Sequence, residues 1–334
     1  MTEMMRAVFV DQKRELVDRS LPMPTPNDHD VLVKIQAISI NPIDIKRIHR
    51  ITALDPRILG YDAVGEVVQL GPKSQQYQVG DQIFYAGTTS RNGSYADYQL
   101  VDERITARTP QHIGVAQAAA MPLTWLTAYE ILIDKLGYHP TYQQNSGTIL
   151  VINGAGGAGS VLVQLAKWLG LTAIGTSSPA NFDWLHSHGT TWELDYHDDL
   201  VHQVRQYVPM VDAVINLFDT AKYFEAATEV IRPFGHIVNV ALTPSPLEIT
   251  KLQAKSASFD WELMFTKANL GYDLESQGQA LRLLATLLDE GVIRSTATKI
   301  LREPIDANHI QQAHQLLNAH QMVGKMVIVR EDTK

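Results

Sequence analysis

The stretch SGTILVINGAGGAGSVLVQLAKWLGLTAIGTSSPANFD, residues 146–183, decides the fold. Residues 148–152 form a short apolar run, which is typical of a buried strand. Glycine and alanine fill positions 154–159, and the next ten residues carry apolar side chains at helical spacing. A second apolar run, residues 171–176, ends in hydroxyl side chains. The pattern predicts one βαβ unit whose helix begins after a glycine-rich turn.

The glycine-rich turn has the spacing of a dinucleotide site. Gly154, Gly156 and Gly159 match G-x-G-x-x-G between a strand and a helix. Glycine lets a pyrophosphate approach the backbone, and the helix N-terminus offers free N–H groups to it. A tight turn without a ligand, or a mononucleotide site, is the alternative. The residues predicted to hold the pyrophosphate are Gly154, Ala155, Gly156, Gly157, Ala158 and Gly159.

Composition narrows the class of protein. A chain of 334 residues favours two domains, and a net charge of −8 argues against nucleic-acid or anionic-membrane binding. The sequence has no apolar run long enough for a membrane span and no signal-like start, so we expect a cytoplasmic protein. It also has no cysteine, which excludes disulfides, thiolate zinc ligands and a cysteine nucleophile.

The segments on either side of the βαβ unit differ in character. Residues 4–104 contain many short strand-like runs separated by turns, which predicts a mostly β domain. The proline-rich residues 20–30 are predicted to be a loop. After residue 183 strands alternate with helices, as in a doubly wound parallel sheet. The run at 324–332 is predicted to be a strand that rejoins the first domain.

An ordered set of segments supports a family resemblance. They are SINPIDIKR, ILGYDAVGEVVQLGP, VGDQIFYAG, GSYADYQLVDE, AAAMPLTWLTAYE, the glycine turn and GKMVIV. Together they resemble the medium-chain dehydrogenase/reductase superfamily, and most closely its zinc-free quinone oxidoreductase branch. KSASFDWELMFTK resembles a subgroup labelled zinc-type alcohol dehydrogenase-like.

This resemblance implies an α/β fold with two domains. A GroES-like, β-rich catalytic domain would comprise residues 1–123 and 267–334, with a Rossmann domain, a doubly wound parallel sheet, inserted at 124–266. It also implies hydride transfer from NADPH in the cleft between the domains. A homodimer joined through the last Rossmann strand is implied as well.

The zinc ligands of the superfamily are missing. In zinc-containing members a Cys stands at the position of Asn41, a His-Glu pair at Tyr61-Asp62, and a second Cys near residues 122–123. The four-cysteine structural lobe is also absent. Without thiolates or clustered His and carboxylate ligands, we expect neither a catalytic nor a structural metal.

The end of the second Rossmann strand bears on the choice of cofactor. NAD-preferring enzymes usually place an acid there, whereas this chain has hydroxyl residues, which favours NADPH over NADH. No Lys or Arg lies between Lys167 and Arg205, so the usual charged partner of a 2′-phosphate is missing locally. An ordinary polar loop cap is the alternative for the serines. The candidate contacts to the 2′-phosphate or adenosine are Thr176 and, by resemblance, Ser177, Ser178 and Tyr196.

Other candidate cofactor contacts follow strands or begin a helix. By resemblance Thr124 lies near the nicotinamide ribose, or else it caps its helix. Ligands bind beyond the carboxyl ends of parallel strands, which makes the residues after the later strands candidates. These are Phe218, Asn239, Val240 and Leu242, of which Val240 could equally be core.

Asn41 and Tyr61 are the candidate catalytic residues. By resemblance Asn41 faces nicotinamide and substrate, where its amide would polarise a carbonyl; alternatively it only ends a strand before Pro42. Tyr61 takes the place of a zinc ligand, and its phenol could donate a hydrogen bond or proton, with simple packing as the alternative. Asp44 is expected to cap the helical piece that follows. The histidine pair His186 and His188 is expected at a solvated surface, as are His309, His314 and His320.

The leading interpretation is an NADPH-dependent, zinc-free reductase of quinones or α,β-unsaturated carbonyls. Its partner would be a small-molecule quinone or enone, with no nucleic acid and no membrane. A carbonyl or alcohol dehydrogenase without zinc is a second reading. A third is an NADPH-binding sensor or structural protein with little catalysis.

Overall fold

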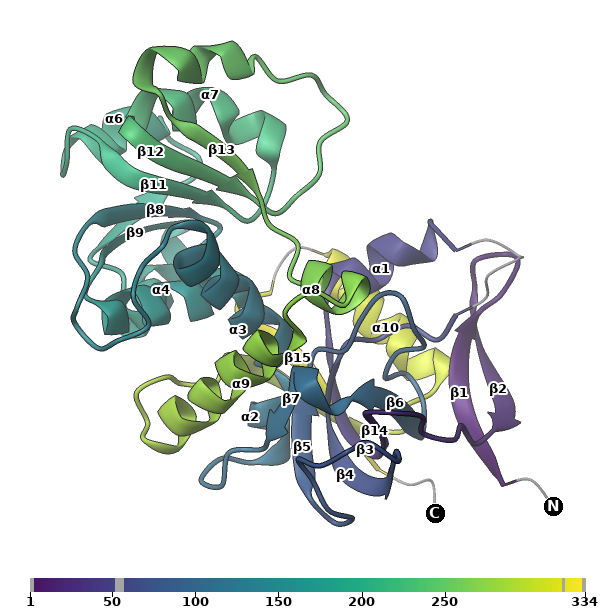
Figure 1. Cartoon of the computed structure of the whole chain (residues 1–334). Helices are drawn as coiled ribbons and strands as arrows, with labels where there is room; N and C mark the ends of the chain where they lie inside the picture. Colours follow the sequence, from purple (N-terminus) through teal and green to yellow (C-terminus); the bar gives the residue numbers. More distant parts are fainter. Residues whose placement is uncertain (1–2, 52–56, 320–321, 332–334) are drawn as a thin grey trace. The chain divides into compact units, whose positions relative to one another are not determined.

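The computed structural model describes residues 3–51, 57–319 and 322–331. The chain divides into two compact units, which Figure 1 shows in one view. The first unit comprises Met1–Leu123 and Phe265–Lys334, and the second comprises Thr124–Met264. Among the described residues, no helix combines the length and hydropathy that crossing a bilayer requires.

The first unit is built on β-sheets. Two antiparallel strands, β1 and β2, form a ribbon, and the larger sheet has the order β14-β15-β3-β4-β5-β7, with β6 also paired to β3. The strands are β1 Met4–Val10, β2 Leu16–Pro22, β3 Asp30–Ile40, β4 Asp62–Leu70, β5 Gln82–Tyr85, β6 Tyr98–Asp102, β7 Thr106–Arg108, β14 Ala297–Glu303 and β15 Lys325–Arg330.

The late strand β15 rejoins the sheet of the first unit, as predicted. It lies between β14 and β3, and Ile328 pairs with Ile38 in antiparallel register. The predicted loop at 20–30 is wrong in its first part, because β2 extends to Pro22, which pairs with Met4. Proline is tolerated there because β2 is an edge strand that needs no further donor.

Helices pack onto the sheets of the first unit. They are α1 Pro42–Ile48, α2 Val115–Ala119, α8 Phe265–Leu270, α9 Leu274–Asp289 and α10 Ala307–Asn318, with a 3₁₀ turn η1 at Glu103–Ile105. The buried face of α9 includes Leu281, Leu284, Leu287 and Leu288, which recur at the spacing of an amphipathic helix. A Cβ at Gly278 would lie 2.4 Å from the carbonyl oxygen of Arg104, so glycine permits this close approach of α9.

The second unit is a parallel sheet with the strand order β10-β9-β8-β11-β12-β13. This is the doubly wound order of a Rossmann domain, with the first strand in the middle. The strands are β8 Thr148–Ile152, β9 Thr172–Ser177, β10 Trp192–Asp195, β11 Val211–Asn216, β12 Ile231–Asn239 and β13 Ser258–Trp261.

Helices connect these parallel strands. They are α4 Gly157–Leu169, α5 Phe182–His188, α6 Leu200–Arg205 and α7 Thr220–Val230, with 3₁₀ turns η3 at Pro179–Asn181 and η4 at Ile249–Lys255. Before the sheet, α3 spans Pro122–Tyr129 and continues as a π-helical segment, η2, at Glu130–Lys135. α2 and α3 are separate helices, because Pro122 begins a new helix and cannot continue the preceding one. The fold is therefore a GroES-like β unit with an inserted Rossmann unit.

Candidate active site

The glycine-rich turn is fastened to the end of the neighbouring strand. Asn153 N donates to Thr176 Oγ1 at 3.0 Å, and Gly154 N donates to Thr176 O at 2.9 Å. A Cβ at Gly159 would lie 2.3 Å from Asn153 O and 2.6 Å from Gly154 Cα. Gly159 thus allows α4 to begin directly against the turn.

The N-terminus of α4 fits the pyrophosphate of a dinucleotide. The helix has 13 residues, its N-cap is Gly156, which has no side chain to cap it, and its first turn contains no acid. The first N–H groups of a helix have no intrahelical partner. Here they are left for a bound anion, which the helix dipole also favours. The residues of this turn therefore fit the group that the sequence predicts.

A buried hydroxyl on α4 supports the turn from behind. Trp184 Nε1 donates to Ser160 Oγ at 2.8 Å, and Ser160 Oγ donates to Ala155 O at 3.2 Å. These two bonds connect α5 to the glycine turn. The sequence analysis missed this support, although a serine on an otherwise apolar helix face was a usable signal.

Several predicted cofactor residues meet at the carboxyl edge of the sheet. Asn216 at the end of β11 stands in register with Ile152 and Asn239, and Val240 N donates to Asn216 O at 3.1 Å. Asn239 is buried, whereas Phe218 and Leu242, beyond the strand ends, are exposed. The structure thus brings the ends of β8, β11 and β12 together where Rossmann sheets bind ligands.

The hydroxyl residues at the end of β9 and directly after it are unequally accessible. Thr176 is buried, and its Oγ1 already accepts from Asn153 N. Ser177 is also buried, and its Oγ donates to Ser178 O at 2.9 Å. Ser178 is half-buried and Tyr196 is exposed. Of the predicted 2′-phosphate contacts, the structure therefore leaves Ser178 and Tyr196 the most open.

Thr124 lies in the first turn of α3, which begins at Pro122. It is therefore not the N-cap of this helix, which was the alternative role. Its buried side chain belongs to the second unit.

In the first unit, a buried cation joins two of the positions that carry zinc ligands in zinc-containing members. Lys325 Nζ lies 2.5 Å from Asn41 Oδ1, 3.3 Å from Asp62 Oδ2 and 3.1 Å from Ile40 O. Burial lowers the pKa of Lys325, and the neighbouring Asp62 carboxylate opposes that shift. The Lys325 ammonium group therefore binds the oxygen atoms that would have to coordinate a metal ion.

The residues present do not fit a zinc ion. Asn41 provides an amide where a thiolate would bind, and Asp62 is already paired with the Lys325 ammonium. Among the described residues, no three His, Cys, Asp or Glu side chains gather as a metal site. Carbonyl polarisation by a metal is therefore not a step that these side chains support.

The Asn41 amide is fully engaged within the protein. Asn41 is 1% exposed. Its Nδ2 donates both hydrogens, to Ser39 O at 3.2 Å and to Asp62 Oδ2 at 2.9 Å, while its Oδ1 accepts from Lys325. In this arrangement both amide hydrogens are bound within the protein, so the Asn41 amide has no hydrogen left to donate to a substrate oxygen.

Asp44 links this cluster to α10. Its Oδ2 accepts from Asn41 N at 2.7 Å, as a residue that caps α1, and from Tyr95 OH at 2.9 Å. Tyr95 OH also lies 3.0 Å from His314 Nε2. Burial raises the pKa of Asp44 to about 7, and burial lowers the pKa of His314 to about 4.

Tyr61 presents a hydroxyl without a partner. The residue is 1% exposed, and its ring packs edge-on against Phe265 with 4.9 Å between the centroids. None of the described residues makes a hydrogen bond to its hydroxyl group. Burial, followed by the nearby Asp44 charge, raises the pKa of Tyr61 above its usual value, so the phenol keeps its proton. Among Asn41 and Tyr61, Tyr61 has the available donor.

Two histidines expected at the surface are buried instead. His188 stacks on Trp184 with 3.9 Å between ring centroids, and His314 faces Tyr95. Both rings fill space beside aromatic side chains, which a helical surface pattern does not reveal. His186 is exposed beside Glu193, and His309 is half-buried beside Asp306. His320 lies outside the described residues.

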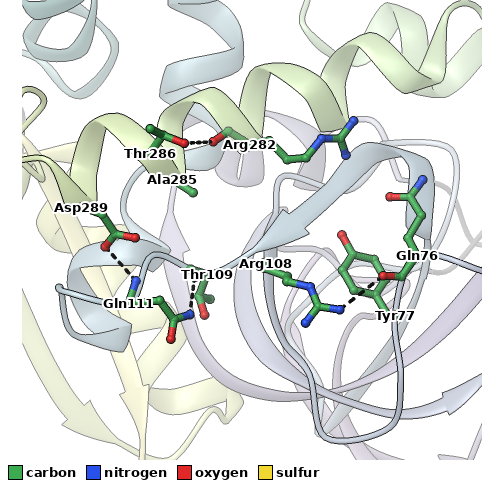
Figure 2. A pocket seen from close by; sticks show the side chains of 9 residues that line it. All are labelled: Gln76, Tyr77, Arg108, Thr109, Gln111, Arg282, Ala285, Thr286 and Asp289. Carbon is green, nitrogen blue, oxygen red and sulfur yellow. Dashed lines mark hydrogen bonds between the residues drawn. The ribbon is translucent and has the colours of Figure 1, made fainter.

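A separate groove lies between α9 and the segment after β7. Figure 2 shows its lining, and its volume is about 440 Å³. Arg108 Nη1 lies 2.8 Å from Asp81 Oδ1, and Asp289 Oδ1 accepts from Gln111 N at 2.7 Å. None of the predicted site residues lines this groove. Its lining is Gln76, Tyr77, Arg108, Thr109, Gln111, Arg282, Ala285, Thr286 and Asp289.

Comparisons with known proteins agree with this fold. Residues 27–111 match the alcohol dehydrogenase GroES-like domain, and residues 189–328 match the zinc-binding dehydrogenase family. The chain belongs to the medium-chain dehydrogenase/reductase superfamily, as the sequence motifs predict. Within it, a zinc-type alcohol dehydrogenase-like protein of Staphylococcus epidermidis is 36% identical over 312 residues, which cover 92% of each chain.

More distant relatives carry names that describe reactions. A 2-methylene-furan-3-one reductase of Solanum lycopersicum is 27% identical over 93% of this chain and 74% of its own. The similarity to this reductase therefore extends over nearly the whole of the present chain.

Solved structures give the same picture. A putative zinc-dependent alcohol dehydrogenase from Rhizobium etli superposes with a TM-score of 0.92 at 34% identity, covering all of both chains. A quinone oxidoreductase from Coxiella burnetii gives 0.80 at 25% identity, covering 98% of this chain and 99% of that one. A mycobacterial protein in complex with NADPH gives 0.82 at 26% identity, covering 97% and 99%. The protein is thus an oxidoreductase of this superfamily by descent.

Proposed function

We propose that this protein is an NADPH-dependent reductase of quinones or α,β-unsaturated carbonyls that works without zinc. One observation supports a reaction without a metal ion: the Lys325 ammonium group is bound to Asn41 and Asp62. Because these positions hold a cation of the protein itself, the substrate oxygen must be polarised by something other than a metal. Tyr61 has the free hydroxyl for that task.

The relatives support the cofactor and substrate class. The tomato relative is named as a reductase of an enone, and one structural neighbour is named a quinone oxidoreductase. Another neighbour was solved with NADPH. A quinone and an enone share a conjugated carbonyl, whose oxygen gains negative charge as a hydride adds to the conjugated system.

Each part of the site has a role in this proposal. Bound NADPH would supply the hydride from C4 of its nicotinamide. The turn 154–159 and the N-terminus of α4 would hold its pyrophosphate, and Ser178 and Tyr196 its adenosine end. The Tyr61 hydroxyl would donate to the substrate oxygen where charge develops, which is the position at which a donor aids reduction most. The hydrogen bonds among Asn41, Asp62 and Lys325 would keep this part of the site rigid.

Tyr61→Phe tests the proposal. Loss of one donor to a developing oxyanion costs on the order of 100-fold in kcat. We expect that loss with an enone or a quinone, with an unchanged Kd for NADPH because the cofactor contacts proposed here lie on the second unit. Tyr142→Phe is the matched control, since Tyr142 is exposed.

A substrate panel tests the class of reaction. Quinones, enones, aldehydes and alcohols are assayed by the absorbance of NADPH. Turnover confined to aldehydes and alcohols would contradict the proposed substrate class. Tight NADPH binding without turnover of any compound would favour a binding protein instead of an enzyme, and a higher kcat/KM with NADH would contradict the cofactor.

We also propose a homodimer that forms along β13. This strand is an edge of the six-stranded sheet, and its Trp261 is 43% exposed. An exposed edge with apolar side chains is suited to pairing with a second copy. Sedimentation should show a dimer at micromolar concentration, and Phe259→Pro, which removes an N–H from the strand, should weaken it. A wild-type monomer would contradict the proposal. We expect the protein in the cytoplasm, which cell fractionation would check.

A further inference from the structure

The carboxyl ends of β9 and β10 bring His197 close to Ser177 and Ser178, two residues of the candidate 2′-phosphate site. Asp195, the last residue of β10, stands in register with Ser177. The next residue, Tyr196, donates its N–H to Ser177 O at 3.3 Å. His197 follows immediately. The turn after β10 therefore adjoins the turn after β9, which is where a Rossmann domain binds the ribose of the adenosine.

The His197 ring is held at one end and open at the other. Its Nδ1 lies 2.6 Å from Asp195 Oδ1, and its ring centroid is 4.1 Å from that of Tyr196. The His197 side chain is 60% exposed. None of the described residues makes a hydrogen bond to Nε2. An imidazole fixed through one nitrogen, with the other in solvent, is a directed donor once it is protonated.

We propose that His197 is the cationic residue that recognises the 2′-phosphate of NADPH, with Asp195 as the residue that positions its ring. The inference rests on the proposed function, because it assumes that NADPH is the cofactor. No Lys or Arg lies between Lys167 and Arg205, and phosphates are best bound by charged donors. In the bound state the imidazolium donates through Nδ1 to Asp195 and through Nε2 to the phosphate, beside Ser178 and Tyr196.

A purely structural role explains Asp195 but not the imidazole. His197 N donates to Asp195 Oδ1 at 3.0 Å, which already closes the turn. This bond comes from the main chain, so any residue other than proline at 197 would form it. Beyond that main-chain bond, the exposed ring contacts Asp195 and the neighbouring Tyr196, and a charge that appears near neutral pH is specific to histidine.

Binding of the 2′-phosphate should consequently take up a proton. The negative charge of Asp195 and that of the phosphate both favour the imidazolium form in the complex. The remaining charged or titratable side chains on the surrounding turn and on α5, β10 and α6 are Asp183, His186, His188, Glu193, Tyr196, Asp198, Asp199, His202 and Arg205. His186 and Glu193 pair with each other, and Asp199 caps α6.

Calorimetry on the full chain tests this inference without turnover. 2′,5′-ADP and 5′-AMP are titrated near neutral pH in buffers of different ionisation enthalpy, so that proton uptake is measured directly. We expect wild type to take up more protons with 2′,5′-ADP than with 5′-AMP. In His197→Gln that excess should shrink, and the Kd for 2′,5′-ADP should rise at least about 10-fold, while the Kd for 5′-AMP is unchanged. His186→Gln is the matched control and should behave as wild type.

Other outcomes overturn the inference. Unchanged binding of 2′,5′-ADP by His197→Gln would show that the ring does not contact the phosphate. Equal weakening of both nucleotides would show a structural role only. If wild type bound 2′,5′-ADP no better than 5′-AMP, the NADPH preference itself would fail as well. If His197→Gln bound 2′,5′-ADP as wild type does, while wild type still bound 2′,5′-ADP more tightly than 5′-AMP, only the role of His197 would fail. The proposed function would then stand, so the two failures are distinguishable.

Discussion

At the scale of single residues, Lys325 is the side chain on which its neighbours depend most. It is buried, and it compensates the Asp62 carboxylate within a network that also fixes Asn41. Breaking a buried ion pair by removing one partner leaves an uncompensated charge, which costs about 3–5 kcal/mol. We expect Lys325→Met to lower the free energy of unfolding by this amount, measured in urea.

The matched variants separate charge from packing. Lys299→Met changes an exposed lysine on β14 and should alter stability by less than about 0.5 kcal/mol. The double variant Lys325→Met with Asp62→Asn removes both charges and should recover part of the loss. A double variant as unstable as the sum of the single variants would show that the two charges do not interact.

The sequence predicts individual site residues better than their partners. Asn41 and Tyr61 stand out because they replace zinc ligands in a recognisable motif. Lys325, however, lies 284 positions from the Asn41 that it contacts. No local spacing links the two, because the contact exists only after β15 has paired with β3. Only the structure shows that Asn41 is engaged while the Tyr61 hydroxyl is free.

At the scale of elements, the glycine turn of the second unit depends on the absence of side chains. A Cβ at Gly159 would lie 2.3 Å from a backbone oxygen, so the turn and α4 would have to separate. We expect Gly159→Ala to weaken NADPH binding at least about 10-fold, because the N–H groups of α4 would no longer converge on the pyrophosphate. The Kd is measured by fluorescence titration.

Gly114→Ala is the control for this substitution. Gly114 also precedes a helix, but the nearest neighbour of an added Cβ is the flexible end of the Gln117 side chain. This variant should bind NADPH as wild type does. Equal affinity of Gly159→Ala and wild type would contradict the proposed place of the pyrophosphate.

The connection of α10 to α1 through Tyr95 predicts opposing pH effects. Asp44 holds its proton in the folded state up to about pH 7, whereas the unfolded carboxyl loses it near pH 4. Asp44 therefore makes stability fall as the pH rises from 4 to 7. His314 stays neutral in the folded state down to about pH 4, while the unfolded ring is protonated below about 6.5. His314 therefore makes stability rise with pH over that window.

Single variants should reveal these two slopes. Relative to wild type, Asp44→Asn should become more stable, and His314→Gln less stable, as the pH rises between 4.5 and 6.5. Each slope is at most about 1.4 kcal/mol per pH unit. Urea unfolding at several pH values measures them. Parallel curves for wild type and either variant would show that the corresponding group does not change its proton affinity on folding.

Element prediction from the sequence succeeded where periodicity was strong. The amphipathic α9 and the apolar strand β8 have clear patterns. The edge strands β2 and β14 were missed because most of their side chains are not buried, so no core-facing pattern marks them. Their places are set by pairing with β1 and β15, which a local pattern cannot contain.

At the scale of the whole molecule, the second unit is continuous in sequence and the first is not. The second unit has its own core, which includes Leu150, Ile174, Val214 and Ile237. We expect residues 124–264 to fold alone and unfold cooperatively in circular dichroism. Residues 1–123 alone should not, because they lack β15 and α9. A cooperative transition in the shorter fragment would contradict this division.

The sequence predicts this two-part plan because the family motifs occur in order along the chain. It also predicts that the strand after residue 323 returns to the first sheet. It does not predict what that return accomplishes chemically, since the ammonium group of Lys325 becomes a partner of Asn41 and Asp62 only in three dimensions.

The position of Lys325 in β15 has a consequence for biosynthesis. On the ribosome, Asp62 emerges more than 260 residues before the lysine that neutralises it. Until β15 arrives, Asp62 must stay hydrated and the neighbouring sheet incomplete, because a buried carboxylate without its cation is unfavourable. The inserted Rossmann unit can mature in the meantime, since domains fold as units during synthesis. A chain that is interrupted before residue 325 would therefore contain a finished Rossmann unit and an open β unit, and proteases can recognise and remove such a chain.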